Sequence, residues 1–553
     1  MARKLRKIYP MILIFSILLF PGCEKIFGKP IENEIFGYVQ NEDGPVQGAI
    51  VRIQATELFS ITNELGYFQI KDQVYDHSVI VTAWSEGHYI GWVETTPASF
   101  PIVIPISKYS TSDNLNYDWS PEEGGFGSIG CAECHPAYDE WLSDAHSQSA
   151  VNPRFLTMYS GADLDGNISP PTQYGFNRDY GTFQLRPDPD QPYYGPGYKL
   201  DFPDSAGNCA TCHVPAQAAY PGKEYTSDPL TAANIEVEGI FCNFCHKIGD
   251  VILDPQTGLP RPNMPGVLSI QLFRPADDAE ELFLGNFDDV AGPDSYLPLY
   301  EQSAYCAPCH SASFWDVTVY NSYGEWLNSP YSHPQEGQTC QECHMPAVDY
   351  EFFVYPNQGG VRRDPQVIRD HNMTGFMEET LMENAVTLDA DASIVGDQVD
   401  LVVSVFNDQT GHAVPTDHPL RQVILLVEAR GNTGKSLELI EGSTIPFYGG
   451  VGDPSDGYYA GQPGKIYMKV LQEIWTEFYP SGAYWNPTRV MSDKRLIPFE
   501  EDKLFFSFSL ADAESIEVRV RLMFRRATKE LMDQKDWDVP DILMEQVNLS
   551  LQK

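Results

Sequence analysis

Ten of the eleven cysteines in this 553-residue chain fall into five copies of one pattern, Cys-x-x-Cys-His. Two thiols three positions apart can form thioether bonds to the two vinyl groups on one edge of a haem, and the imidazole that follows can bind the iron. The copies are Cys131-Ala-Glu-Cys134-His135, Cys209-Ala-Thr-Cys212-His213, Cys242-Asn-Phe-Cys245-His246, Cys306-Ala-Pro-Cys309-His310 and Cys340-Gln-Glu-Cys343-His344.

Two other uses of paired cysteines fit this pattern less well. Zinc ribbons pair Cys-x-x-Cys units but do not require a histidine directly after each second cysteine. Thioredoxin-like dithiols place one such motif, not five, beside a βαβ unit. The sequence therefore predicts five covalently bound haem c groups, with the histidine of each motif as the proximal iron ligand.

The other seven histidines decide what fills the sixth position on each iron. His77 and His88 lie in an N-terminal region without a haem motif, where packing or surface roles are expected. Two more follow copies of a Glu-Trp-Leu segment, in "EWLSDAH" and "EWLNSPYSH". Five candidates thus remain for five sixth positions: His146, His333, His371, His412 and His418.

The first 22 residues have the form of an export signal, with four basic residues followed by an apolar stretch of about a dozen. The quartet Phe20-Pro21-Gly22-Cys23 resembles a bacterial lipoprotein cleavage box, which predicts acylation of Cys23. Ordinary signal cleavage, which would leave Cys23 a free thiol, is the alternative. Both predict an exported protein on the periplasmic or cell-surface face of a bacterial envelope, and the first adds a lipid anchor.

The formal net charge of −41 excludes one class of partner. A chain this acidic repels phosphate backbones, so nucleic-acid binding is not expected. Redox proteins, either other cytochromes or quinol-linked donors, are the expected partners. The sequence does not indicate whether the chain forms oligomers or filaments.

Strand-like alternation of apolar residues occurs on both sides of the haem motifs. It runs through Ala49, Val51, Ile53 and Ala55 near the start, and through Val399, Leu401, Val403 and Val405 and then Val518, Val520, Leu522 and Phe524 near the end. The region between, rich in Pro, Gly and Tyr, suits a domain of loops and short helices wrapped around porphyrin. The segments "GYVQNEDGPVQGAIVRI" and "ITNELGYFQI" resemble carboxypeptidase-regulatory-like domains, which are transthyretin-type β sandwiches.

The expected fold class is therefore multidomain: an N-terminal transthyretin-like β sandwich, a loop-rich, mainly α multihaem domain and a C-terminal β sandwich. The predicted boundaries are 1–22 for the signal peptide, 34–107 for the first sandwich, 108–127 for a linker, 128–383 for the five-haem domain and 384–553 for the second sandwich. A loop at 411–421 is expected to reach back to the haems.

Several segments together resemble exported multihaem c-type cytochromes that carry a C-terminal β domain. They are "CAECHPAYDEWLSDAH", "EGIFCNFCHKIGD", "CQECHMP" with the later "HNMTGF", "GHAVPTDHPLR" and "SDKRLIPFEED". The resemblance implies sixth-ligand roles for His146, His333, His371 and His412. It does not assign His418, which is the fifth candidate by number alone.

The segment "GADLDGN" at 161–167 has Asp163, Asp165 and Asn167 at the spacing of a calcium loop. It lacks the bidentate glutamate of an EF-hand, so a plain turn is preferred to a calcium site.

Three functions from different classes remain. The first is an electron-transfer protein that passes electrons along mostly bis-histidine haems, with no catalytic residues. The second is a reductase of a small nitrogen or sulfur oxyanion at one open haem. The third is a binding or scaffold protein whose haems are structural.

Overall fold

The computed structural model of the chain describes residues 34–71, 77–96, 101–119, 127–333, 337–375, 379–510 and 513–553. The predicted signal peptide and Cys23 lie outside these residues. The chain divides into two compact units, here called the N-terminal unit (described residues of 1–85 and 90–107) and the main unit (86–89 and 108–553). In the described ranges, each helix is too short or too polar to cross a bilayer.

The N-terminal unit is built from two four-stranded sheets. The first contains β1 (Ile35–Asn41), β2 (Gly44–Pro45), β5 (Tyr67–Ile70) and β8 (Ile102–Pro105), and the second contains β3 (Ile50–Ile53), β4 (Phe59–Ile61), β6 (Val79–Trp84) and β7 (Gly91–Thr95). Alternate residues of both sheets meet in one apolar core that includes Val39, Val51, Phe68 and Val81. This confirms the prediction of β sheets in the N-terminal unit.

One glycine lets the first sheet close. Strand β8 runs parallel to β1, with Gly37 opposite Ile102. A Cβ at Gly37 would lie 2.0 Å from the carbonyl oxygen of Ile102, so only glycine fits this close approach of two strands.

The central part of the main unit consists of loops, two-stranded ribbons and short helices. Its loop-rich character agrees with the prediction from the sequence, whereas the ribbons were not predicted in a domain expected to be mainly α. The longer helices are α1 (Ala137–Ser143) and α2 (Pro153–Ser160), and single helical turns carry most of the haem motifs. The segment 108–119, predicted as part of a linker, packs into this unit. Its Asp113 carboxylate binds the fully buried guanidinium of Arg274 at 2.7 Å, and Trp119 is buried among Phe241 and Phe244.

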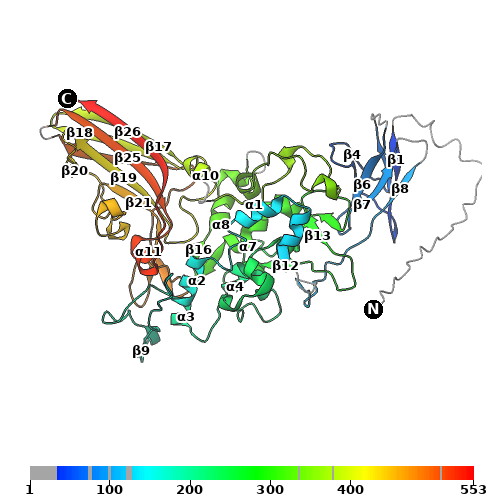
Figure 1. The fold of residues 1–553 in the computed structure, drawn as a ribbon, viewed down its shortest axis with the longest axis horizontal. Helices are drawn as coiled ribbons and strands as arrows, with labels where there is room; N and C mark the ends of the chain where they lie inside the picture. Colours follow the sequence, from blue (N-terminus) through cyan, green and yellow to red (C-terminus); the bar gives the residue numbers. More distant parts are fainter. Residues whose placement is uncertain are drawn as a thin grey trace, which may run out of the picture. The chain divides into compact units, whose positions relative to one another are not determined.

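The C-terminal part of the main unit is a second pair of sheets, shown in yellow to red in Figure 1. One sheet has the order β17-β18-β24-β20 and the other the order β21-β19-β25-β26. The strands are β17 (Thr387–Val395), β18 (Gln398–Phe406), β19 (Gln422–Gly431), β20 (Leu439–Glu441), β21 (Gly464–Tyr467), β24 (Glu501–Ser509), β25 (Ser515–Arg525) and β26 (Ile542–Gln552). The eight apolar residues that predict strands here all lie buried in β18 and β25.

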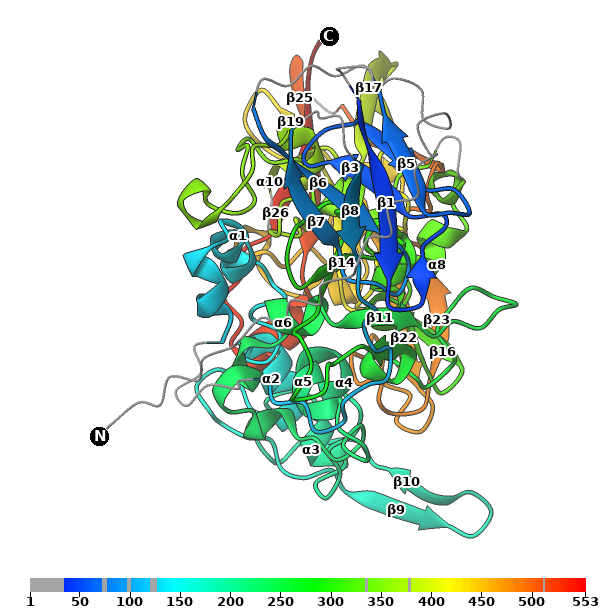
Figure 2. The ribbon, with the colours of Figure 1, turned by 90° about the vertical axis from the view of Figure 1, so that its right-hand side faces the viewer.

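Two smaller elements complete the main unit. A hairpin of β9 (Tyr174–Asn177) and β10 (Gly181–Gln184) extends away from the helices, as Figure 2 shows. Helix α11 (Lys529–Lys535) lies between β25 and β26 in the chain, and its buried Lys535 ammonium donates to the carbonyl oxygens of Thr157 and Ala162. These bonds join the C-terminal part to the helical part.

Candidate haem-binding site

Each Cys-x-x-Cys-His motif forms or borders a helical turn. The backbone N–H of the motif histidine donates to the carbonyl oxygen of the first motif cysteine in the first, second and third copies, at 2.8, 3.1 and 3.0 Å. Positions i, i+3 and i+4 of such a turn share one side, so both thiols and the imidazole face the same way. All ten motif cysteines are free and half-buried.

These side chains all line one continuous cavity in the main unit, with a volume of about 2120 Å³. A pocket for one drug-sized ligand measures about 300–1,000 Å³, so this cavity has room for several large groups. It is lined by both cysteines and the histidine of every motif, and by four of the five predicted sixth ligands: His146, His371, His412 and His418.

Three predicted sixth ligands each face a proximal imidazole. The ring centres of His146 and His310 lie 6.2 Å apart, those of His371 and His246 6.4 Å, and those of His412 and His344 6.2 Å. A metal–imidazole bond is about 2.0 Å and the ring centre lies about 1.15 Å further, so two imidazoles on opposite sides of one iron have centres about 6.3 Å apart. The three pairs match the spacing that one iron requires.

The tautomer of these rings also suits iron. Backbone carbonyl oxygens accept from Nδ1 of His135, His213, His246, His344, His371 and His412, at 2.5–3.1 Å. Nδ1 of His146 donates to the carboxylate of Asp144 at 2.6 Å. Because Nδ1 carries the proton, Nε2 of each ring keeps the lone pair that a metal needs.

Burial adds to this by keeping the rings neutral. It lowers the pKa of His213 and of His246 to about 4, and it also lowers the pKa of His344 and His371. His310 is the exception, because the carboxylate of Asp417 outweighs burial and raises its pKa.

His418, the fifth predicted sixth ligand, has the opposite tautomer. Its Nδ1 accepts a hydrogen bond from the backbone N–H of Leu420 at 3.3 Å, so the proton of the neutral ring is on Nε2. Burial, and then the charge of Arg421, lowers its pKa to about 3. Its ring neighbours are Tyr320 and Tyr484 at 6.4 and 5.8 Å, and it lies outside the three imidazole pairs.

His333 is exposed and does not contribute to the cavity wall that the described residues form. The two Glu-Trp-Leu segments explain this difference from the expected role. Ser147 and Ser332 both donate to the carbonyl oxygen of the leucine five residues earlier. The residue before each serine is His146 in the first copy and Tyr331 in the second, so Tyr331 takes the structural place of His146 and His333 lies two residues beyond it.

The proximal rings of His135 and His213 have phenylalanine neighbours. The ring of Phe353 lies 6.2 Å from that of His135, and the ring of Phe155 stacks on His213 at 3.6 Å with an interplanar angle of 1°. The structure therefore pairs three of the five proximal imidazoles with a second histidine.

The glutamates of the two Glu-Trp-Leu segments hold the loops that carry sixth ligands. Glu140 in α1 accepts from the backbone N–H of His371 at 2.8 Å. Glu325 in α8 (Ser322–Leu327) accepts from the backbone N–H of Ala413 and from the hydroxyl of Thr416, at 3.0 and 2.7 Å. The histidines after these segments were predicted from the sequence as functional residues and the glutamates were not, although the repeated Glu-Trp-Leu pattern contains both glutamates.

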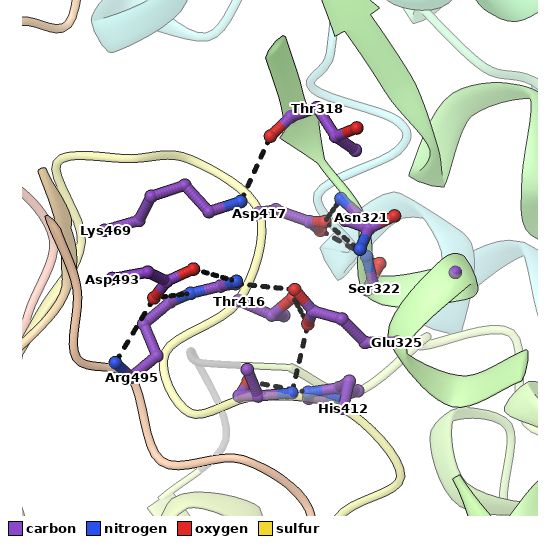
Figure 3. A network of polar contacts seen from close by, with 12 residues as sticks. Thr318, Asn321, Ser322, Glu325, His412, Thr416, Asp417, Lys469, Asp493 and Arg495 are labelled. Carbon is purple, nitrogen blue, oxygen red and sulfur yellow. Dashed lines mark hydrogen bonds and ion pairs between the residues drawn. The ribbon is translucent and has the colours of Figure 1, made fainter. Parts of the chain in front are cut away.

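Figure 3 shows how Glu325 is fixed in turn. Arg495 donates to Glu325 at 2.6 Å and to Asp493 at 2.8 Å, and the side chains of Arg495 and Glu325 are largely buried. The segment "SDKRLIPFEED" therefore contributes an arginine that fastens the 411–421 loop to α8. The predicted contact of this loop with the cavity is present through His412, Asp417 and His418.

Contacts between motifs give the order in which they adjoin. The thiol of Cys131 is near enough to that of Cys242 to affect its pKa, and the same holds for Cys212 with Cys309 and for Cys306 with Cys340. The hydroxyl of Tyr305, next to Cys306, donates to the carbonyl oxygen of Cys245 at 3.1 Å. The fourth motif thus adjoins the second, third and fifth, and the first motif adjoins the third.

The carboxylate of Asp163, in the segment weighed as a calcium loop, is engaged within its own turn. Its two oxygens accept from the backbone N–H and the side-chain amide of Asn167, both at 2.8 Å. These are the bonds of the plain turn that the sequence analysis preferred.

Comparison with known structures supports the fold. The chain is similar to a penta-haem cytochrome c552 from Thermochromatium tepidum, with a TM-score of 0.52 and 18% identity over 77% of this chain and 98% of that one. Two cohesin–X-dockerin complexes of Acetivibrio cellulolyticus match 14% and 18% of the chain at 22% and 19% identity, with TM-scores of 0.11 and 0.12. Neither a protein-family model nor a curated protein matches the sequence.

The architecture follows from these observations. It is multidomain, with β sheets at both ends and a loop-rich central region whose fold resembles that of a multihaem cytochrome. The five motifs, the cavity they share and the matched imidazole pairs are the features that fit haem c.

Replacing Glu140 or Glu325 with alanine is expected to loosen the loop that carries His371 or His412. Each change leaves backbone N–H groups without their acceptor, at a local cost of about 1–3 kcal/mol. With haem bound, each variant should gain a high-spin fraction in one haem, measured by electron paramagnetic resonance and by carbon monoxide binding after reduction. Glu64→Ala, at an exposed position of the N-terminal unit, is the control, and an unchanged low-spin spectrum in both variants would contradict the assignment.

Proposed function

We propose that the protein is a pentahaem c-type cytochrome that transfers electrons, with Cys131, Cys209, Cys242, Cys306, Cys340 and their partner cysteines as attachment points. The observation that carries this proposal is the set of three opposed imidazole pairs at 6.2–6.4 Å. Two histidines on one iron saturate its coordination and favour transfer of single electrons over substrate chemistry. Haem supplies the one-electron couple, and the chain fixes ligands, spacing and surroundings.

The order of the motifs supports transfer along a chain of centres. Motifs one, three and four adjoin in series, and motif four also adjoins two and five. Motif cysteines near enough to affect one another would bring the attached haem edges close together, so electrons could pass between centres within the protein.

The first test counts haems and their spin states. Mass spectrometry of the denatured exported protein should find five added haem masses, because each motif offers both thiols and a proximal imidazole. Electron paramagnetic resonance of the oxidised protein should find at least three low-spin bis-histidine signals. Four or fewer haem masses, or fewer than three such signals, would contradict the proposal.

We also propose that the protein is exported and anchored by acylation of Cys23, on the periplasmic or cell-surface face of the envelope. The support is the basic and apolar order of residues 1–22 and the cleavage-box-like quartet that ends at Cys23. A fixed position would bring the haem chain to redox partner proteins, such as other cytochromes or quinol-linked donors.

Cys23→Ser tests the anchor. The variant is expected to move from the membrane fraction to the soluble fraction, because acylation needs the thiol, with its haem content unchanged. Fractionation followed by haem absorbance measures both quantities. A wild-type protein that is soluble without detergent would contradict the anchor and leave the electron-transfer proposal intact.

A second function, reduction of a small nitrogen or sulfur oxyanion, is favoured by the surroundings of His213. Three arginines line the cavity wall here: Arg154, which precedes Phe155 in α2, Arg421 and Arg526. Burial and the charge of Arg421 lower the pKa of Arg154. Burial, then the charges of Arg154 and Arg421, lowers the pKa of Arg526 to about 10. Neighbouring positive charges that repel one another in an otherwise acidic protein favour the binding of an anion between them.

Donors for such an anion lie beside the arginines. His418, with its proton on Nε2, packs against Tyr320 and Tyr484, whose hydroxyl groups are hydrogen-bonded to each other. Reduction of nitrite to nitric oxide, for example, takes up one electron and two protons and releases water. The haem chain would supply the electron, and these hydroxyl and imidazole groups are placed to pass protons.

Arg154→Gln and Arg526→Gln test this second function. A charged hydrogen bond contributes about 1.5–3 kcal/mol, so each variant should bind nitrite or sulfite about tenfold more weakly. The measurement is the anion-induced change in the absorption spectrum of the oxidised protein. The control is Arg178→Gln, whose side chain is 91% exposed. If the arginines pair only with haem propionates, added anion will not change the spectrum. That result would contradict the reductase function.

A further inference from the structure

The imidazole pair of the fourth motif differs from the other two pairs in the groups that lie next to its Nδ1 atoms. Nδ1 of His146 donates to the Asp144 carboxylate at 2.6 Å, and Nδ1 of His310 lies 3.6 Å from the Asp417 carboxylate. In the pairs His371/His246 and His412/His344, all four Nδ1 atoms donate to backbone carbonyl oxygens instead. The Glu140 carboxylate lies 3.9 Å from Nδ1 of His371, so the third-motif pair has a carboxylate near one ligand, whereas the fourth-motif pair has one behind each ligand.

Both carboxylates are held in place. Asp144 follows α1, its side chain is 5% exposed, and the oxygen that binds Nδ1 also accepts from the backbone N–H of His146 at 2.8 Å. Asp417 accepts from the backbone N–H groups of Asn321 and Ser322 at 3.1 and 3.0 Å, as Figure 3 shows. Its φ of 58° is uncommon for a residue other than glycine. The backbone strain at Asp417 is offset by the bonds that fix its carboxylate.

A carboxylate at Nδ1–H draws the ring proton toward itself and increases the negative charge on Nε2. A more basic imidazole stabilises ferric iron relative to ferrous iron, because the ferric ion carries one more positive charge. Partial burial strengthens the effect, since charges act over a lower effective dielectric constant than in water. Two such ligands act on the same iron when they face each other, as His146 and His310 do.

We infer that Asp144 and Asp417 are positioning residues that hold the haem of the fourth motif at a lower reduction potential than the haems of the third and fifth motifs, the other two with paired imidazoles. The inference rests on the proposed haem ligation by His146 and His310. The fourth motif, which adjoins the second, third and fifth, would then have a distinct role, because an electron on its haem would be higher in free energy than one on the haem of the third or fifth motif. Electrons would therefore occupy the fourth haem only briefly and reside mainly on those two neighbours.

Asp144→Asn and Asp417→Asn test the inference, alone and together. Asparagine keeps an oxygen acceptor of similar shape but removes the charge. At a fixed solution potential, each change should raise the ratio of reduced to oxidised haem about tenfold for one haem, which is a shift of about 59 mV for a one-electron couple. Both substitutions should act on the same haem, and Asp144→Glu, which keeps the charge, should restore the low potential.

The readout is a potentiometric titration followed by electron paramagnetic resonance. The rings of His146 and His310 are inclined at 59°, whereas the other pairs are inclined at 27° and 14°, so the ferric signal of this haem should be distinguishable. The control is Asp370→Asn. Asp370 accepts from the backbone N–H of Asn372 beside His371 but does not bind a ring nitrogen, so its loss should leave the fourth haem unchanged.

Four results separate the inference from the proposed function. Upward shifts in the potential of the same haem in both variants support the inference. Shifts no larger than that of the Asp370→Asn control overturn it. Shifts of two different haems also overturn it, because the two carboxylates would then not share an iron. Absence of low-spin bis-histidine signals in the wild-type protein overturns the ligation itself. If Asp144→Asn fails to retain haem, Asp417→Asn alone decides between the first two results.

Discussion

The hydrogen bond at Nδ1 is the interaction on which the site depends. An imidazole binds iron through Nε2 only when its proton is on Nδ1, and a fixed acceptor at Nδ1 secures both the tautomer and the direction of the ring. For three of the proximal rings the acceptors come from distant segments: Phe353 for His135, Ser149 for His213 and Thr374 for His344. The loops between the motifs, which have little regular structure, thus have a specific task. Each supplies a backbone carbonyl to a ring that another segment provides.

The C-terminal sandwich is part of this arrangement rather than a separate module. It contributes the 411–421 loop, and Glu325 and Arg495 fasten that loop to helix α8 between the fourth and fifth motifs. Lys535, fully buried, makes a second connection to the helical region through Thr157 and Ala162. Burying an ammonium group is unfavourable unless its hydrogen bonds are satisfied, so these two carbonyls determine where α11 docks.

Local patterns in the sequence were sufficient to find the five motifs and to place strands β3, β18 and β25, because both depend on short-range spacing. The positions of His146, His371 and His412 beside proximal rings also agree with the predicted set, although ligation itself stays a prediction. Tertiary register could not be predicted. His333 follows its Glu-Trp-Leu segment by two residues more than His146 does, and this difference leaves it exposed while Tyr331 faces the cavity. His418 looked equivalent by count, but the N–H of Leu420, a purely local backbone contact, reverses its tautomer.

The order of residues along the chain has a consequence for how such a protein matures. All five attachment motifs end at His344, whereas His371 and His412 come later, and Arg495, which secures the His412 loop, comes later still. If haem is attached as proposed, every attachment motif lies N-terminal to two of the residues that would fill sixth positions. The position that His412 would fill then stays exchangeable until the C-terminal sandwich has folded and Arg495 has fixed Glu325. The C-terminal strands would in this way limit the reactivity of a haem that is attached far from them in the sequence.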